Sequence, residues 1–135
     1  MTRDRAVAEI QTALSSFIKA FNTLDWEQFR SCFTENATVF HPDNPETRDL
    51  GRLEGTDQIE QSFGLVFDAA RRQASGPPYL HIEPKNVRVQ LLLNAAVVTF
   101  EFDRAQASLG RRTVVLEKRS GDWKIVHFHA SNLSL

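Results

Sequence analysis

Three polar side chains in the last third of the chain have the types and the spacing of a site for an anion. Arg104 and Arg112 flank a turn predicted at Ser108–Gly110, so they should lie at the same end of two neighbouring strands. Pairing of the last two strands then brings Asn132 near Arg112. A guanidinium group presents a fork of N–H donors that matches a carboxylate or a phosphate. The sequence therefore predicts an anion-binding cluster; the alternative is that both arginines are solvated at the hairpin end.

Two histidines, His127 and His129, stand two residues apart in the final strand. Side chains two residues apart share one face of a strand, so both rings could bind one metal ion. A zinc site needs at least three protein ligands, and no third ligand is evident on this face. We therefore predict no metal site, and we interpret both histidines as residues of the outer sheet face, either solvated or in a dimer contact.

The elements that would position these residues begin with helices. Apolar residues recur at three- and four-residue steps from about 4 to 23, which is typical of a helix packed on a core. A short second helix follows the N-cap residue Asp25 and includes Phe33. Residues 37–41 are then predicted to form a strand, 42–49 a polar loop and 50–54 a brief strand, before Thr56 acts as the N-cap of a third helix.

Extended segments dominate the second half of the chain. Strands are predicted over about 80–92, 95–107 and 111–120 and from 123 onward. The predicted turns are Leu93–Asn94, Ser108–Gly110 and Gly121–Asp122, which connect the four strands as an antiparallel meander. Helices followed by a meander indicate an α+β fold in which helices cover one face of a sheet.

Alternation along the strands predicts which side chains face the helices. The even-numbered residues of 98–104 and of 126–132 form the smoother apolar sets and should point inward, whereas Ile125, His127 and His129 should point outward. An apolar cleft with a few convergent polar groups is the usual form of a small-molecule site. Its wall is expected to comprise Phe17, Phe21, Trp26, Phe63, Phe67, Phe100, Phe102 and Phe128.

Composition excludes several classes of protein. The chain has 135 residues, which predicts a single domain over 1–135, and a net charge of −1, which does not suggest nucleic acid or an anionic membrane as partner. Cys32 is the only cysteine, and no apolar run is long enough to span a bilayer, so we expect a soluble cytoplasmic protein. No glycine-rich phosphate loop, cysteine cluster or carboxylate cage is present, so no cofactor is predicted.

With these segments placed, the chain resembles the nuclear-transport-factor-2-like superfamily over nearly its whole length. The stretch at 123–131, Trp-Lys-Ile-Val-His-Phe-His-Ala-Ser, is similar to the closing strand of SnoaL-like proteins and of the association domain of calcium/calmodulin-dependent protein kinase II. The stretch at 37–42, Ala-Thr-Val-Phe-His-Pro, resembles the helix-to-strand step of ketosteroid isomerases and polyketide cyclases. The resemblance implies a cone: a curved, mostly antiparallel sheet wrapped around three N-terminal helices.

The resemblance also implies roles for single residues. His41 stands where the isomerases hold a proton-shuttling aspartate, and it should lie near Val114 in the same pocket. The isomerases' enolate-stabilising tyrosine and aspartate correspond to Phe17 and Val114, neither of which donates a hydrogen bond. Isomerisation by that mechanism is therefore not expected. The pocket arginines of the kinase association domain correspond to Phe102 and Val114, and a structural role for His41 at the strand end stays open.

Two functions remain, because this superfamily serves catalysis, binding and assembly alike. The first is a homodimer that binds a small, anionic molecule in an apolar pocket ending in histidine, arginine and asparagine; it is either a non-catalytic binder or a lyase, isomerase or cyclase with His41 as acid–base group. The dimer contact is predicted on the outer sheet face, with Thr113, Ile125 and His127. The second is a non-catalytic assembly module. The sequence identifies no substrate.

Overall fold

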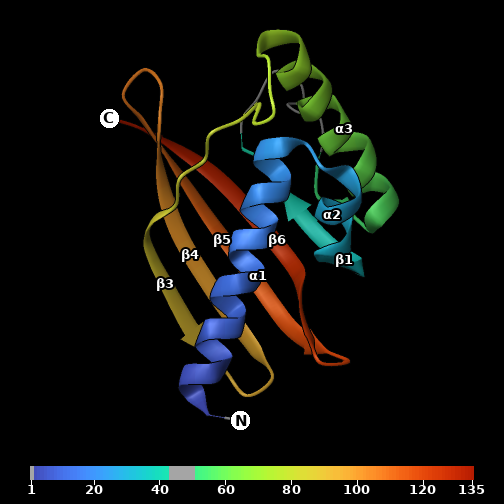
Figure 1. Cartoon of the computed structure of the whole chain (residues 1–135), viewed down its shortest axis with the longest axis vertical. Coiled ribbons are helices and arrows are strands. Elements are labelled where there is room, and N and C mark those ends of the chain that lie inside the picture. Colours follow the sequence, from blue (N-terminus) through green and yellow to red (C-terminus); the bar gives the residue numbers. More distant parts are fainter. Residues whose placement is uncertain (1, 43–50) are drawn as a thin grey trace.

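The computed structural model describes residues 2–42 and 51–135. Three helices precede the long strands (Figure 1). The helices are α1 (Arg3–Thr23), α2 (Trp26–Ser31) and α3 (Thr56–Gln73). The strands are β1 (Phe33–Phe40), β2 (Leu53–Glu54), β3 (Lys85–Leu91), β4 (Ala95–Arg104), β5 (Ser108–Arg119) and β6 (Asp122–Ser134). No helix within the described ranges is long and apolar enough to cross a membrane.

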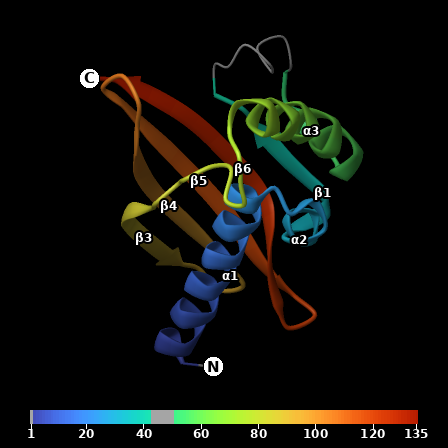
Figure 2. The same ribbon diagram turned by 45° about the horizontal axis from the view of Figure 1, so that its top comes forward.

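The six strands form one sheet in the order β2-β1-β6-β5-β4-β3. Neighbouring strands are antiparallel except β1, which runs parallel to β6. The long strands curve around α1, which lies across them, while α2 and α3 stand on the side of β1 (Figures 1 and 2). The predicted α+β cone, with three N-terminal helices inside a curved and mostly antiparallel sheet, is confirmed.

Aromatic rings from the three helices and the sheet form the core. Phe29 of α2 is fully buried and lies at the centre. Its ring centroid is 4.8 Å from that of Phe63 on α3, 5.2 Å from that of Phe17 on α1 and 5.3 Å from that of Phe33 on β1. Offset and edge-to-face contacts at these distances add to the stabilisation from burial alone. The helical stripes read from the sequence therefore converge on one aromatic cluster.

The junction of α1, α2 and β1 differs in part from the prediction. The Asp25 carboxylate accepts a hydrogen bond from the Gln28 backbone N–H, so the predicted N-cap is confirmed. The prediction that Phe33 belongs to α2 is wrong, because Phe33 already begins β1 and pairs with Ile125 of β6. The predicted loop at 42–49 and the first residue of the predicted strand at 50 lie outside the described residues, apart from Pro42. The prediction that Thr56 caps α3 is wrong, because Thr56 is the first residue of the helix and Gly55, which has no side chain to form a cap hydrogen bond, precedes it.

Strand β3 starts at Lys85, five residues later than predicted, and Asn22 of α1 explains the difference. The Asn22 carboxamide donates to the Ile82 carbonyl at 3.1 Å and accepts from the Ile82 N–H at 3.0 Å. The N–H groups of Tyr79 and Leu80 donate to the Asn22 backbone carbonyl at 2.8 Å and 3.1 Å. These backbone groups are satisfied by α1 rather than by a neighbouring strand. The extended segment before β3 is thus fixed to the helix.

The turn between β4 and β5 lies at residues 105–107, not at Ser108–Gly110 as predicted. Gly110 is instead inside β5, opposite Phe102 of β4, and a Cβ atom there would overlap the Phe102 ring. This glycine provides the room that the ring needs on the inner face rather than the freedom of a turn. The last turn also shifts by one residue, because Ser120 and Gly121 adopt the positive φ angles of 51° and 85° that a two-residue hairpin favours.

An irregularity in β6 reverses one predicted side-chain direction. The β5–β6 register shifts between the pairs Val115↔His127 and Leu116↔Ile125, so Val126 is an extra residue in β6. Ile125 therefore faces inward, is 2% exposed and belongs to the core. The predictions that Ile125 points outward and that it contributes to a dimer surface are wrong. Beyond the shift, Phe128, Ala130 and Asn132 face the helices as predicted.

Candidate functional site

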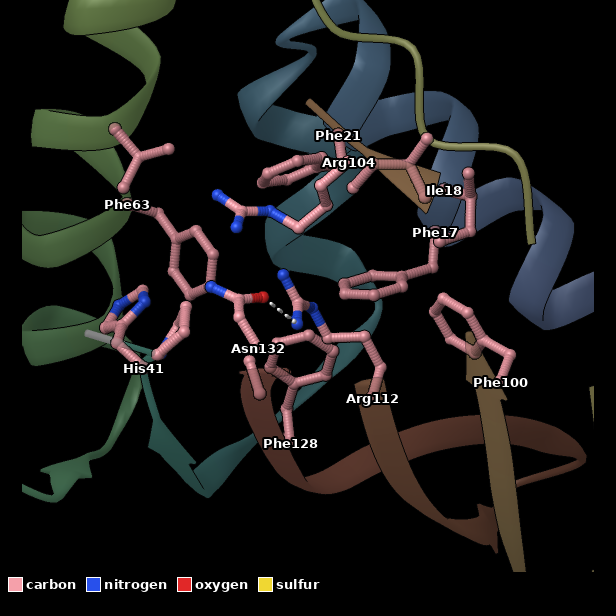
Figure 3. Close-up of a pocket in the computed structure, with 14 residues that line it drawn as sticks. Phe17, Ile18, Phe21, His41, Phe63, Phe100, Arg104, Arg112, Phe128 and Asn132 are labelled. Atoms are coloured by element: carbon pink, nitrogen blue, oxygen red, sulfur yellow. Dashed lines mark hydrogen bonds between the residues drawn. The ribbon is translucent and has the colours of Figure 1, made fainter. Parts of the chain in front are cut away.

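A cavity of about 100 Å³ lies between α1, α3 and the inner face of the sheet (Figure 3). Its wall is mostly apolar, and its polar groups come from β4, β5, β6 and the end of β1. The lining residues are Phe17, Ile18, Phe21, His41, Pro42, Phe63, Val66, Ile82, Phe100, Arg104, Arg112, Phe128, Ala130 and Asn132. A concave apolar site with a few convergent polar groups has the form of a small-molecule pocket.

Eight of the twelve residues predicted to bind a ligand line this cavity, and so does His41. The other four lie in the surrounding core. Trp26 and Phe67 pack against each other, with ring centroids 6.2 Å apart, in the aromatic cluster between the helices. Val114 is 1% exposed beneath the cavity floor, and Phe102 lies under the Arg112 guanidinium. These four therefore support the wall rather than form it.

Arg112 is the most constrained polar group of the cavity. Its Nη1 donates to two backbone carbonyls, that of Ser131 at 2.9 Å and that of Arg111 at 3.0 Å. It also donates to Asn132 Oδ1 at 3.3 Å (Figure 3). The predicted proximity of Arg112 and Asn132 is confirmed. Burial, with a smaller contribution from the positive charge of Arg104, lowers the pKa of Arg112 to about 10. The guanidinium thus stays charged at neutral pH in a site that penalises charge.

A stack of three residues on the inner face holds this guanidinium in place. The Arg112 Cζ atom lies 4.7 Å from the centroid of the Phe102 ring, a cation–π distance. The ring in turn covers Gly110, where no side chain opposes it. Gly110 is next to Asn132 in the β5–β6 register, so the stack sits directly beside the amide that contacts Arg112. The Phe102 ring, which packs on Gly110 and contacts Arg112, therefore fixes the position of the Arg112 guanidinium.

Arg104 lies at the outer end of the cavity, where it is more exposed than Arg112. Its Nη1 donates to Ser108 Oγ at 3.0 Å across the turn between β4 and β5. Figure 3 shows its guanidinium at the same end of the cavity as the ends of the Arg112 and Asn132 side chains, with aromatic side chains around them. The two arginines are thus brought together at one end of the cone, although they are not cross-strand partners: Arg104 pairs with Ser108 and Arg112 with Phe100.

His41 borders the cavity from the end of β1, and Ser62 of α3 holds its ring. The Ser62 hydroxyl and His41 Nε2 are 2.5 Å apart, and the ring centroid lies 4.6 Å from that of Phe63. Ser62 is 1% exposed, so this hydrogen bond satisfies a hydroxyl that water cannot reach. The position predicted next to Val114 is shifted, because Val39 pairs with Phe128 at that level and His41 follows two residues later, toward Arg112.

The protonation state of His41 follows from its surroundings. Burial lowers the pKa of this imidazole to about 4, and the positive charge of Arg112 lowers it further in the same direction. His41 is therefore neutral at physiological pH, with one ring nitrogen as donor and the other as acceptor. Nε2 contacts Ser62, which leaves Nδ1 as the ring nitrogen that can exchange a proton with a bound molecule.

The two histidines of β6 lie on the opposite sheet face from the cavity, as predicted. His127 Nδ1 is 2.7 Å from the Thr38 hydroxyl of β1, and the ring of His129 is 5.3 Å from that of Phe40. Within residues 2–42 and 51–135, no group of three or more potential ligands that could hold a metal ion is present. The pair is thus a feature of the outer surface, separate from the cavity.

Ser62 is the site residue that the sequence analysis did not single out. It stands three residues after Ile59 and one before Phe63, both of which belong to the apolar stripe of α3. A hydroxyl on a buried stripe needs a partner, and that requirement was the available signal. The partner itself could not be read from the sequence, because His41 and Ser62 are joined only when β1 packs against α3.

Comparisons with known proteins identify the family. The SnoaL-like domain model matches residues 10–134. The fold is shared with a candidate dehydratase of the nuclear-transport-factor-2-like family from Streptomyces avermitilis, which is 19% identical with a TM-score of 0.78 and coverage of 98% of this chain and 99% of that one. A cystatin-like fold protein from Burkholderia xenovorans LB400 is 22% identical, with a TM-score of 0.71 and coverage of 98% and 95%.

A candidate ketosteroid isomerase from Parabacteroides distasonis ATCC 8503 has the same fold at 22% identity, with a TM-score of 0.64 and coverage of 89% of this chain and 84% of that one. No curated protein matches the sequence. At these identities the solved structures establish the fold alone, whereas the domain match spans nearly the whole chain. The chain therefore belongs to the SnoaL-like domain family, one of the groups that its closing strand resembled, and it has the fold of proteins called nuclear-transport-factor-2-like.

Proposed function

We propose that the protein binds a small organic molecule in this cavity and moves a proton on it, with His41 as the acid–base residue. The observation that carries the proposal is the placement of a neutral imidazole at the cavity wall, opposite the guanidinium of Arg112. A positioned base and a fixed positive group on either side of one small volume suit reactions in which a proton leaves and negative charge develops. The cavity is not filled by side chains, which favours ligand binding over an assembly module.

The proton transfer would use the free ring nitrogen of His41. Nδ1 takes a proton from the bound molecule, and the electron pair left behind moves onto an oxygen of that molecule. Arg112 and the Asn132 amide are the donors near enough to one another to stabilise this oxygen. The imidazolium then returns the proton to another atom of the same molecule, for isomerisation, or to a departing hydroxyl group, for elimination of water. Either outcome leaves His41 neutral again.

Two of the similar structures carry names for reactions of this class: one a dehydratase and one a ketosteroid isomerase, both as candidates. They support proton transfer as the reaction type and do not identify the substrate. Phe17 and Val114 replace the hydrogen-bond donors that the resemblance to ketosteroid isomerases would require. In this protein Arg112 and Asn132 would supply those donors from a different part of the wall, so the substrate need not be a steroid.

We also infer a homodimer that forms through the outer sheet face. This face carries Thr113, His127 and Phe40, and the Phe40 side chain is 38% exposed. No helix of the described residues covers it, because all three helices lie on the other side of the sheet (Figures 1 and 2). Sedimentation should give twice the monomer mass, and a charge introduced by Thr113→Glu should produce monomers. A wild type that stays monomeric at high concentration would contradict this inference.

Exchange of carbon-bound hydrogen with heavy water tests the catalytic proposal without a known substrate. The protein is incubated in heavy water with small aldehydes, ketones and keto acids, and deuterium next to the carbonyl group is measured by mass spectrometry. We expect exchange with the wild type, none with His41→Gln, and wild-type exchange with His129→Gln, which changes a histidine of the outer face. Equal exchange by the wild type and His41→Gln would remove His41 from the mechanism.

A further inference from the structure

We propose that the ligand of this cavity is a small monocarboxylic acid, whose carboxylate binds the free edge of the Arg112 guanidinium while its apolar body fills the aromatic end. This inference deepens the proposed function, since it names the chemical class that the same site selects. It rests on the hydrogen-bond partners of Arg112, on the absence of a neutralising charge among the described residues, on the size of the cavity and on its lining.

The guanidinium of Arg112 is only partly satisfied. An arginine side chain has five N–H donors, and all three acceptors found for Arg112 lie at Nη1. Within the described part of the chain, Nε and Nη2 have no acceptor. A fully buried donor without a partner costs roughly 1–3 kcal/mol. Arg112 is partly buried, so its free edge carries a part of this cost. The Nε–Nη2 edge is one of the two forks that bind a carboxylate through two parallel hydrogen bonds.

The positive charge is also uncompensated. The ion pairs found among residues 2–42 and 51–135 include neither Arg112 nor Arg104, and no aspartate or glutamate is among the lining residues. Breaking a buried ion pair leaves an expensive unpaired charge, so folded proteins normally place a partner beside a buried cation. Here the partner would be the ligand.

The number of charges favours a monoanion. Arg112 is partly buried, whereas Arg104 lies at the exposed end and bonds to Ser108. One carboxylate neutralises Arg112 and gains from the field of Arg104 without a second charge in the apolar part. A phosphate ester carries close to two negative charges at neutral pH and would bring excess charge among the phenylalanines. The site is therefore matched to a carboxylate rather than to a phosphate.

The rest of the cavity sets the size and polarity of the ligand's body. Phe17, Phe21 and Phe100 line it from α1 and β4, and Ile82 closes the side held by Asn22. An apolar cavity of roughly 150 Å³ holds one benzene molecule, so a partly open cavity of about 100 Å³ accommodates only a compact body, at most about the size of one such ring. Short branched or aromatic acids have this size, and benzoate is a suitable probe.

A bound carboxylate would also change the pKa of His41, the base that acts on the ligand. Among the described residues, the charged groups that line the cavity with His41 are Arg112 from β5 and Arg104 from β4, while the lining residues of α1, α3 and β6 carry no charge. The charge of Arg112 is one of the two causes that lower the pKa of His41. An anion on Arg112 offsets that cause, so the pKa of His41 rises when the ligand binds and the imidazole becomes a better proton acceptor.

Calorimetric titration with benzoate and with benzamide, at physiological salt, tests the inference. The two probes have the same shape and differ in charge. We expect benzoate to bind the wild type about 10- to 100-fold more tightly than benzamide, the value of one charged hydrogen-bond pair. Arg112→Gln should lose this preference, and Arg112→Lys should retain only part of it because a lysine has no fork. Arg111→Gln removes the same charge from the neighbouring, outward-facing position and should bind like the wild type.

Each other outcome counts against one of the two proposals. If benzamide binds the wild type as tightly as benzoate, or if folded Arg112→Gln keeps the preference, the carboxylate inference is overturned while a small-molecule site remains. If neither probe nor any other matched pair of acid and amide of this size binds the wild type, the inference and the proposed function both fail. The comparison of the two probes on the wild type decides the question even if Arg112→Gln does not fold.

Discussion

Replacing His41 by glutamine should change how the stability of the protein depends on pH. The pKa of His41 is about 4 in the folded protein and 6.5 in an unfolded chain. The unfolded state therefore takes up the proton first as the pH falls, and stability is lost between about pH 6.5 and pH 4. Linkage with these two values gives a loss of about 2 kcal/mol between about pH 8 and pH 5. Well above pH 6.5 the imidazole is neutral in both the folded and the unfolded state, so its titration no longer changes the stability.

Urea unfolding of the wild type and of His41→Gln at several pH values measures this term. Subtracting the two curves cancels the contributions of His81, His127 and His129, which both proteins share. The difference in unfolding free energy should change by about 2 kcal/mol in favour of the variant as the pH falls from about 8 to 5. Nuclear magnetic resonance titration of the ring reads the same pKa directly. Parallel stability curves, or a ring that titrates near 6.5, would refute the burial of His41.

Three further substitutions test the packing around the site by urea unfolding. Gly110→Ala should destabilise the protein by about 1–3 kcal/mol, because the new methyl group overlaps the Phe102 ring; wild-type stability would contradict that stack. Gly64→Ala is the matched control in α3, where the methyl group meets open space, and it should stabilise by about 0.5–1 kcal/mol. Ser62→Ala should cost about 1 kcal/mol through the lost bond to His41, and no cost would mean that this bond is not formed.

The sequence predicted the layers of the fold because local periodicity reports burial directly. The helical stripe of α1, the Asp25 cap and the alternating inner face of β4 each follow from positions a few residues apart. These local signals were sufficient for the α+β cone and for the family. They also predicted that Arg104, Arg112 and Asn132 meet at one end of the sheet, because all three were assigned to the inner face of strands that are neighbours in the meander.

The details that depend on pairing between distant segments were decided by the tertiary structure. An extra residue at Val126 shifts the register of β6, and its sequence gives no sign of it because every residue there fits a strand. The segment before β3 is extended but bonds to Asn22, so its composition resembles that of the strand that follows. Gly110 looks like a turn residue, and only the ring of Phe102 above it shows its purpose.

The tertiary structure also decided the charge and the hydrogen-bonding state of the site residues. The sequence supplied a histidine and an arginine as candidates by their types alone. Burial beside α3 makes His41 neutral. Three backbone and side-chain oxygens all accept from Nη1 of Arg112, so its other edge has no partner among the residues that the structure describes. Both properties arise from desolvation and from the positions of surrounding groups, which depend on contacts between segments far apart in the chain. The sequence thus determined which groups are present, and the folded structure determined what they can bind and whether they carry charge.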